Sequence, residues 1–359
     1  MTSSKHGNNI FRYVRQLALV AAIFGILLAG SGPVSAATST GSTITTSPVS
    51  TTLSASPGST VTTTLQLQNN DSKSVNIAVK LEKFKAEGEN GQAQIYAPQT
   101  DDPSISWVHF SESSFVAEPG VWKQIKMTVD VPKSAAFGYY YAVVFSPVTG
   151  PASIPGINTF RGANAILVLL NVHTPGESSK LEIASFSASQ HIYQYLPVDF
   201  TVKVHNPGDI YTAPRGDIYI SRSENGPAID NIELNKGQGN VLPGTNRNFQ
   251  VSWDDGFPVY QVKRVNGQVV SDKSGRPVEQ LVWDFTHLNR LRFGQYYARV
   301  VMVYSDGGRD IPVQGVVSFW VIPWVILLVL LVVLLLIGLG LWTVVRMVVH
   351  RRPRHIRLR

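Results

Sequence analysis

"VNIAVKLEKF" (residues 75–84) alternates apolar and polar side chains. Val75, Ile77, Val79 and Leu81 fall on one side, and polar residues such as Lys80 fall on the other. This period of two is typical of a half-buried β-strand, because successive side chains of a strand point to opposite faces. The stretch therefore predicts a sheet with one face turned toward a core.

Similar strand patterns recur along the chain with turn signals between them. "VTTTLQLQNN" precedes the first stretch, and "QIKMTVDVP" and "VDFTVKVHN" follow it. The dipeptides Asn90-Gly91, Pro119-Gly120, Pro243-Gly244 and Asn266-Gly267 favour turns. No amphipathic helices separate the strands, which disfavours an α/β fold. We predict an all-β chain with two tandem immunoglobulin-like β-sandwiches, with a barrel as the alternative.

One strand pattern occurs twice. "FGYYYAVV" (137–144) returns as "FGQYYARV" (293–300). We interpret the repeat as a core strand used in both sandwiches. The residues that we expect on its core face are Tyr140, Ala142 and Val144 in the first copy, and Tyr296, Ala298 and Val300 in the second.

The opposite face differs between the two copies. Gln295 and Arg299 make it polar in the second copy, whereas Tyr139 and Val143 make it apolar in the first. Either another layer covers this face, for which the apolar run 165–170 is the candidate, or the face is exposed for a partner. We favour the internal cover.

Four residues are candidates for contact with a partner. Trp122 falls out of phase with the apolar positions Ile125, Met127 and Val129 of its strand, so it should face away from the core. The other three candidates lie on the first copy of the repeat: Tyr139, Tyr141 and Val143.

The two ends of the chain carry membrane-targeting patterns. A basic segment, an apolar run at 17–30 and the small residues around Ala36 predict a signal peptide that is cleaved after Ala36, with an uncleaved membrane anchor as the alternative. The uncharged run 321–345 is long enough to span a bilayer, and six arginines follow it without an acid. By the positive-inside rule, the short tail is cytoplasmic and the bulk of the chain is outside.

The positive net charge belongs to these ends. Of 31 basic residues, nine lie in the signal and the tail, where there is no acidic residue, while all 24 acidic residues lie between them. The exported part is therefore close to neutral, and the sequence predicts no nucleic-acid partner. The chain has no cysteine, so its cores must form without disulfides.

These observations predict the following order of segments. They are a signal peptide (1–36), a Ser/Thr-rich disordered leader (37–50), a first sandwich (51–173), a linker (174–180), a second sandwich (181–318) with an insertion (254–290), a transmembrane helix (319–345) and a basic tail (346–359).

The sequence offers little chemistry. The eight histidines are scattered, and neither nucleophile motifs nor phosphate-binding loops occur. The acidic pairs Asp101-Asp102 and Asp254-Asp255 stand beside Pro or Gly, so we interpret them as turn residues, with Ca²⁺ binding as the alternative. We predict no catalytic, cofactor-binding or metal-binding residue, and no enzyme activity.

The whole arrangement resembles the WxL-interacting proteins of Gram-positive cell surfaces. The resemblance is clearest from about Thr60 to Val172, in "SPGSTVTTTLQLQNN", "ENGQAQIYAP", "FGYYYAVVFS" and "RGANAILVLLNV". It implies a peptidoglycan-binding first domain and a second domain that binds host surfaces or partners.

We therefore expect a single-pass surface protein that contacts cell-wall glycan or another envelope protein and is held in the lipid bilayer by its helix. The alternatives are an adhesin for external partners and an accessory subunit of an envelope complex.

Overall fold

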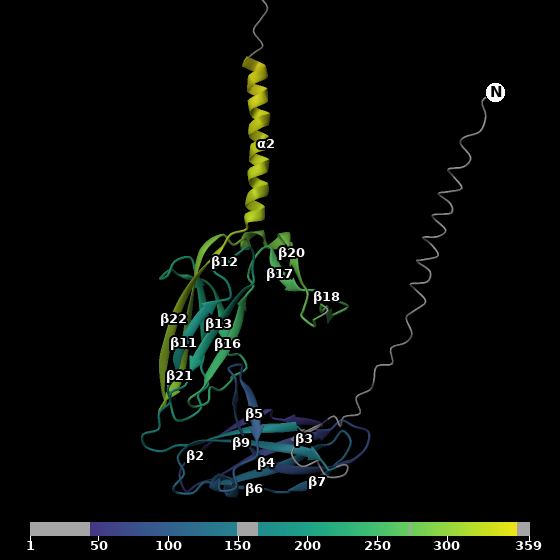
Figure 1. Cartoon of the computed structure of the whole chain (residues 1–359), viewed down its shortest axis with the longest axis vertical. Coiled ribbons are helices and arrows are strands. Elements are labelled where there is room, and N and C mark those ends of the chain that lie inside the picture. Colours follow the sequence, from purple (N-terminus) through teal and green to yellow (C-terminus); the bar gives the residue numbers. More distant parts are fainter. Residues whose placement is uncertain (1–43, 149–163, 273, 350–359) are drawn as a thin grey trace, which may run out of the picture. The chain divides into compact units, whose positions relative to one another are not determined.

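The alternating patterns of the first half form a β-sandwich (Figure 1). The computed structural model describes residues 44–148, 164–272 and 274–349. One sheet has the strand order β1-β3-β8-β6, and the other has the order β2-β10-β9-β4-β5, with β7 paired to β4. The strands are β1 (Ile44–Ser47), β2 (Ser50–Ala55), β3 (Thr60–Asn69), β4 (Val75–Glu87), β5 (Gln92–Tyr96), β6 (Val108–Phe110), β7 (Ser114–Ala117), β8 (Trp122–Asp130), β9 (Phe137–Pro147) and β10 (Asn164–Val172), and the short helix η1 is Pro103–Trp107.

A second sandwich follows, with sheets ordered β11-β13-β16 and β12-β22-β21-β14-β15. The insertion contains two small antiparallel strand pairs, β17–β20 and, between them in sequence, β18–β19. The strands are β11 (Glu182–Ala188), β12 (Ile192–Tyr193), β13 (Val198–His205), β14 (Arg215–Ser221), β15 (Ala228–Leu234), β16 (Asn246–Trp253), β17 (Val259–Val262), β18 (Arg264–Val265), β19 (Gln268–Val269), β20 (Glu279–Val282), β21 (Gly294–Asp306) and β22 (Arg309–Val321), and the short helix η2 is Phe285–Arg290.

The predicted fold class is confirmed: the chain is all-β, with two immunoglobulin-like sandwiches and one C-terminal apolar helix. Each sandwich encloses its own core. Leu65, Ile77 and Ile125 are fully buried in the first, and Trp253 and Phe319 are buried in the second. These residues come from alternate positions of facing strands, which is how a sandwich excludes water without disulfides.

The predicted hairpin turns are present. Asn90-Gly91 lies between β4 and β5, and Asn266-Gly267 joins β18 to β19. Asn266 and Gly267 both have positive φ, 52° and 80°. A two-residue hairpin loop needs this left-handed backbone at both positions, and Asn-Gly supplies it at low steric cost.

Two predicted boundaries are wrong. The leader was predicted to be disordered up to residue 50, but Ile44–Ser47 pairs with β3, and β2 begins at Ser50. The transmembrane segment was predicted from 319, but β22 continues to Val321 because Phe319 and Val321 are both buried in the second core. The signal peptide, the cleavage after Ala36 and most of the basic tail lie outside the described residues.

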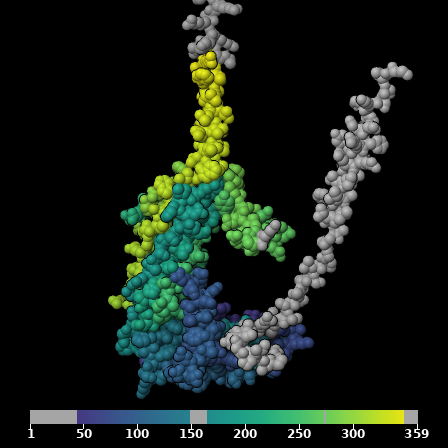
Figure 2. Space-filling model, viewed as in Figure 1, coloured from purple at the N-terminus to yellow at the C-terminus, as the bar shows by residue number. Residues whose placement is uncertain are grey.

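The helix α2 (Trp324–Val349) is the one helix in 44–148, 164–272 and 274–349 that is long and apolar enough to cross a membrane. Its side chains are exposed along most of its length (Figure 2). Only Ile322 and Pro323 separate it from β22. Pro323 suits this place, since the first turn of a helix has no use for a backbone N–H donor.

Candidate binding site

The predicted faces of β9 are the reverse of those that the structure has. Tyr141 and Val143 are fully buried in the first core, so the prediction that they contact a partner is wrong. Tyr139 packs partly buried against the same core, with its ring 4.8 Å from that of Trp107. Register explains this choice: Val143 lies opposite Ile166 on β10 and Leu81 on β4, which share the core face.

The second copy of the repeat behaves as predicted. Tyr296, Ala298 and Val300 are fully buried in the second core, while Gln295 and Arg299 lie on the other face, partly exposed. Residues at equivalent positions of the two copies therefore face different sides: those of the second copy face the core of their sandwich, and those of the first copy face away from it. Tyr140 corresponds to Tyr296 in sequence, yet it points out of its own sandwich.

Trp122 is 43% exposed on β8, whereas Ile125, Met127 and Val129 on the same strand are fully buried. The prediction that Trp122 faces away from the core is confirmed. Its role as a partner contact stays a prediction.

The outer face of β9 is covered as well. Ala142 and Val144 are buried there with Phe84 of β4 and Leu169 of β10. Tyr140 packs edge-on against Phe84 at 5.9 Å between ring centroids. Tyr211 and Leu242, from loops of the second sandwich, pack against this cluster. The run 165–170 is not the cover that the sequence suggested, because β10 pairs beside β9 in the same sheet.

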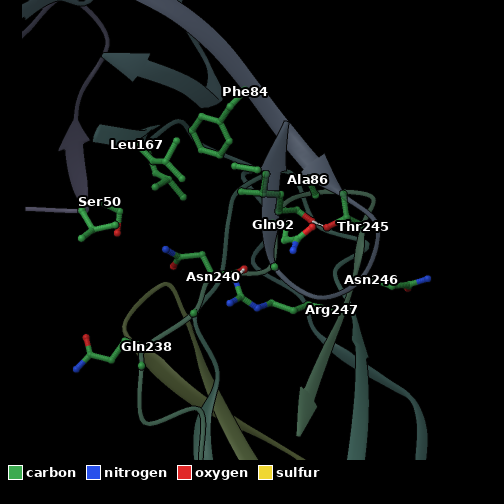
Figure 3. A pocket seen from close by; sticks show the side chains of 18 residues that line it. Ser50, Phe84, Ala86, Gln92, Leu167, Gln238, Asn240, Thr245, Asn246 and Arg247 are labelled. Atoms are coloured by element: carbon green, nitrogen blue, oxygen red, sulfur yellow. Dashed lines mark hydrogen bonds between the residues drawn. The ribbon is translucent and has the colours of Figure 1, made fainter. Parts of the chain in front are cut away.

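A pocket of about 290 Å³ opens beside this cluster. Phe84 and Leu167 lie on one side of it, and Asn240 and Arg247 lie on the other (Figure 3). The lining comes from β4, β5, β10 and the start of β2 in the first sandwich and from the segment 237–247 of the second. The pocket thus combines an apolar wall with a polar, cationic one.

Arg247 is the charged group of this pocket. It is half-buried, its Nη1 donates to the carbonyl oxygen of Asn240 at 2.8 Å, and its guanidinium lies 5.5 Å from the ring centroid of Phe249. Burial lowers the pKa of the guanidinium, although an arginine still carries its charge at neutral pH. Among the described residues, no carboxylate forms an ion pair with it.

Two glycines leave room for this guanidinium. A Cβ atom at Gly91 or at Gly239 would lie 2.4 Å from Nη2 of Arg247. Gly91 also has a φ of +74°, whereas Gly239 has an ordinary backbone conformation. An alanine at 239 would therefore displace the guanidinium without straining the chain or removing the charge.

Glu89, at the tip of the β4–β5 hairpin, bonds to strands of the second sandwich. Its carboxylate pairs with Lys203 at 2.7 Å and accepts from the side-chain amides of Asn246 and Asn248 at 3.2 and 3.3 Å. Its carbonyl oxygen accepts from the backbone N–H of Asn248 at 2.6 Å. The hydrogen bond from Lys203, followed by that from Asn246, lowers the pKa of Glu89. This contact holds the hairpin next to Arg247.

We expect this contact to weaken in acid. Because the pKa of Glu89 is lower in the folded protein, its stabilisation is complete above the ordinary pKa of about 4.3 and is lost as the pH falls through the folded value. Glu89→Gln should lower the melting temperature at pH 7 and have little effect near pH 3, as measured by thermal unfolding across this range. Glu87→Gln, on the same hairpin but exposed, is the matched control. An equal deficit for Glu89→Gln at both pH values would contradict the assignment.

The second aspartate of each acidic pair has structural partners. Asp102 accepts from the backbone N–H of Ser104 at the start of η1, and it pairs with Lys83 at 3.3 Å. Asp255 pairs with Arg290 at 2.6 Å and with Arg292. In the ranges that the structure describes, no three His, Asp or Glu side chains gather as a metal site would require.

Sequence reasoning did not find Arg247. "NRNFQVSW" marks the strand that carries it, but a single arginine at a strand start is unremarkable in a sequence. The nearest feature to Arg247 that the sequence predicted is the turn at Pro243-Gly244. The pocket exists only because segments about 150 residues apart meet.

No family model and no curated protein matches the chain. Similar solved structures include the class 5 fimbriae chaperone CfaA, at 16% identity over 67% of this chain and 100% of that one, with a TM-score of 0.35. They also include the YadV chaperone (11%, 76% and 99%, 0.31) and the CupB2 chaperone of Pseudomonas aeruginosa (10%, 75% and 98%, 0.31). Identities and TM-scores this low say nothing of what this chain binds.

Proposed function

We propose that the chain is a non-enzymatic binding protein of the cell surface, anchored by α2, which holds another envelope protein at the pocket beside Arg247. The observation that carries this proposal is the half-buried guanidinium, which has no ion-pair partner among the described residues and stands opposite an apolar wall. Burying a charge is costly unless it is paired, so a ligand carboxylate would relieve this cost.

The chemistry of the pocket favours a polypeptide ligand with an acidic side chain next to an apolar one. Leu167 and Leu242 offer aliphatic surface, and Phe84 is only 5% exposed. A sugar ring commonly stacks on an exposed aromatic face, and the pocket lining offers none. Binding of wall glycan by the first sandwich, which the family resemblance implies, is the second candidate, and Trp122 supports it as an exposed aromatic.

The anchoring part of the proposal has its own support. The segment Trp324–Arg346 has the length and composition of a membrane span. The arginines that follow it favour a cytoplasmic tail and an external β region.

Photo-crosslinking tests the proposal. A benzophenone amino acid replaces Gln92, which is exposed and lines the pocket, in the full chain expressed at the cell surface. We expect a protein adduct whose yield falls with Arg247→Gln, since a hydrogen bond to a charged group contributes about 1.5–3 kcal/mol, or roughly ten- to a hundredfold in affinity. Gly239→Ala should also lower the yield, because it displaces the guanidinium.

Lys236→Gln removes the same charge from an exposed position of the same loop and should leave the adduct intact. A crosslinker at the exposed Val116 controls for random capture. An adduct that survives Arg247→Gln would contradict the proposal. Retention of the chain on insoluble peptidoglycan, abolished by Trp122→Ala but not by Arg247→Gln, would favour the glycan candidate instead.

A further inference from the structure

The insertion of the second sandwich and the residues that directly follow it carry an exposed apolar surface that the pocket does not explain. Phe285 is 70% exposed, Leu288 56%, Phe293 52%, Trp283 44% and Leu291 38%. All five lie within eleven consecutive residues in and around η2. We name them the juxtamembrane surface. Exposed apolar side chains that gather in this way mark an interaction site rather than ordinary surface.

This surface is held in place by the fold. Phe257 contacts both Trp283 and Phe285, at 5.8 and 5.4 Å between ring centroids. Its backbone N–H donates to the carbonyl oxygen of Arg290 at 3.0 Å, and Phe257 bridges to Leu291. The 5% exposure of Phe257 shows that it is the buried support under the exposed side chains.

The insertion is attached at the end of the sandwich from which α2 leaves (Figure 1). Tyr260 donates its backbone N–H to the carbonyl oxygen of Leu196 at 2.8 Å. Three residues before Leu196, the carbonyl oxygen of Tyr193 accepts from the N–H of Ile322 at 2.7 Å. Ile322 is two residues from the first residue of α2. The base of the insertion and a residue just before the start of the helix are thus both hydrogen-bonded to the short segment 193–196, which begins at the end of β12.

The connection limits how far this end can stand from a bilayer. Two residues span at most about 7 Å when fully extended. If α2 crosses the membrane, the end of the second sandwich lies at the lipid headgroups. Tryptophan and other aromatic side chains favour this layer.

The charged side chains around the juxtamembrane surface are paired with one another, so they do not mark it as a site for a charged partner. Arg290 and Arg292 both pair with Asp255, and His287 bonds to Asp284 at 3.0 Å. The surface is thus apolar, and the positive and negative charges around it offset each other. Such a surface suits the interface of a bilayer and does not require anionic lipid.

We propose that the juxtamembrane surface inserts into the headgroup layer of the membrane that α2 spans, and so fixes the second sandwich on the bilayer. This inference rests on the anchoring part of the proposed function, and it is independent of the pocket at Arg247.

The chain has no cysteine, so a single substitution gives a unique labelling site. Phe285→Cys and Leu288→Cys, each carrying an environment-sensitive nitrobenzoxadiazole label, are prepared in the full chain in phosphatidylcholine nanodiscs. Lipids with a nitroxide near the headgroup serve as the quencher. We expect quenching at both sites to be several-fold stronger than at Val116→Cys, a 52% exposed site on β7. Circular dichroism confirms that each variant is folded.

A label at Leu334→Cys, within α2, reports on the anchor through a lipid with a nitroxide deep in its acyl chain. Quenching at Leu334 without quenching at Phe285 and Leu288 would overturn this inference alone. No quenching at Leu334 would overturn the anchoring and this inference together. Labels at Phe285 and Leu288 that are shielded from aqueous iodide but not reached by lipid quencher would show that a protein covers the surface, and would also overturn it.

Discussion

Tyr141→Ala should lower the free energy of unfolding of the first sandwich by about 3–5 kcal/mol, the range for truncating a fully buried aromatic side chain. Tyr141 is 0% exposed, and its hydroxyl donates to the carbonyl oxygen of Ser104 at 3.2 Å. The Nζ of Lys83 lies 4.8 Å from the centroid of its ring. Truncation leaves a cavity that the rigid sheet around it cannot close, and chemical denaturation of the full chain in detergent measures the loss.

Two variants sharpen this measurement. Tyr141→Phe removes only the hydroxyl and should cost about 1 kcal/mol. Trp122→Ala, on the exposed side of β8, should stay within about 0.5 kcal/mol of the wild type. A Tyr141→Ala protein of normal stability that has lost a partner would show that this residue is a contact and not part of the core.

Trp253→Ala should have an effect of similar size on the second sandwich, about 3–5 kcal/mol. Trp253 is 1% exposed, and its ring lies 5.2 Å from that of Tyr296 and 6.0 Å from that of Phe319. Its indole N–H donates to Asp230 at 2.8 Å. Trp253→Phe keeps part of the packing but loses this bond, so it should fall between the wild type and the alanine variant.

Trp283→Ala is the matched control for this position. It removes the same side chain from the same half of the molecule, but at a site that is 44% exposed. We expect a much smaller change in the denaturation midpoint. A larger loss from Trp283→Ala than from Trp253→Ala would mean that the insertion, and not the sandwich core, limits stability.

Much of the fold follows from local patterns. Residues 75–81 of β4 and the whole of β13 alternate so regularly that the side chains facing the core could be predicted from the sequence, although Phe84, further along β4, is buried on the opposite face of the sheet. Turns at Asn-Gly followed in the same way from the backbone that such turns demand. The chain also predicted its apolar helix, although β22 extends further than the composition indicated, because Phe319 and Val321 fit both a strand and a span.

For the strand β9, the sequence pattern does not determine which face meets the core. All of its positions from 139 to 145 are apolar, so alternation cannot say which face meets the core. The register with β10 and β4 decides this, and register is a property of the assembled sheet. The pocket around Arg247 could not be predicted from the sequence for the same reason. The two glycines that leave room for the guanidinium, Gly91 and Gly239, are far apart in the sequence and meet only in the folded chain.

The short path from β22 into α2 also determines how the molecule would bear mechanical load. A partner pulled away from an anchored chain would apply force between the pocket and the membrane, and that force would enter the second sandwich through the C-terminal end of β22. This strand pairs with β21 along all thirteen of its residues. Tension along its axis would load many of these hydrogen bonds at once in shear, so they would not open one after another. The strand that leads into α2 is therefore also held to its sheet in a geometry that resists such a force.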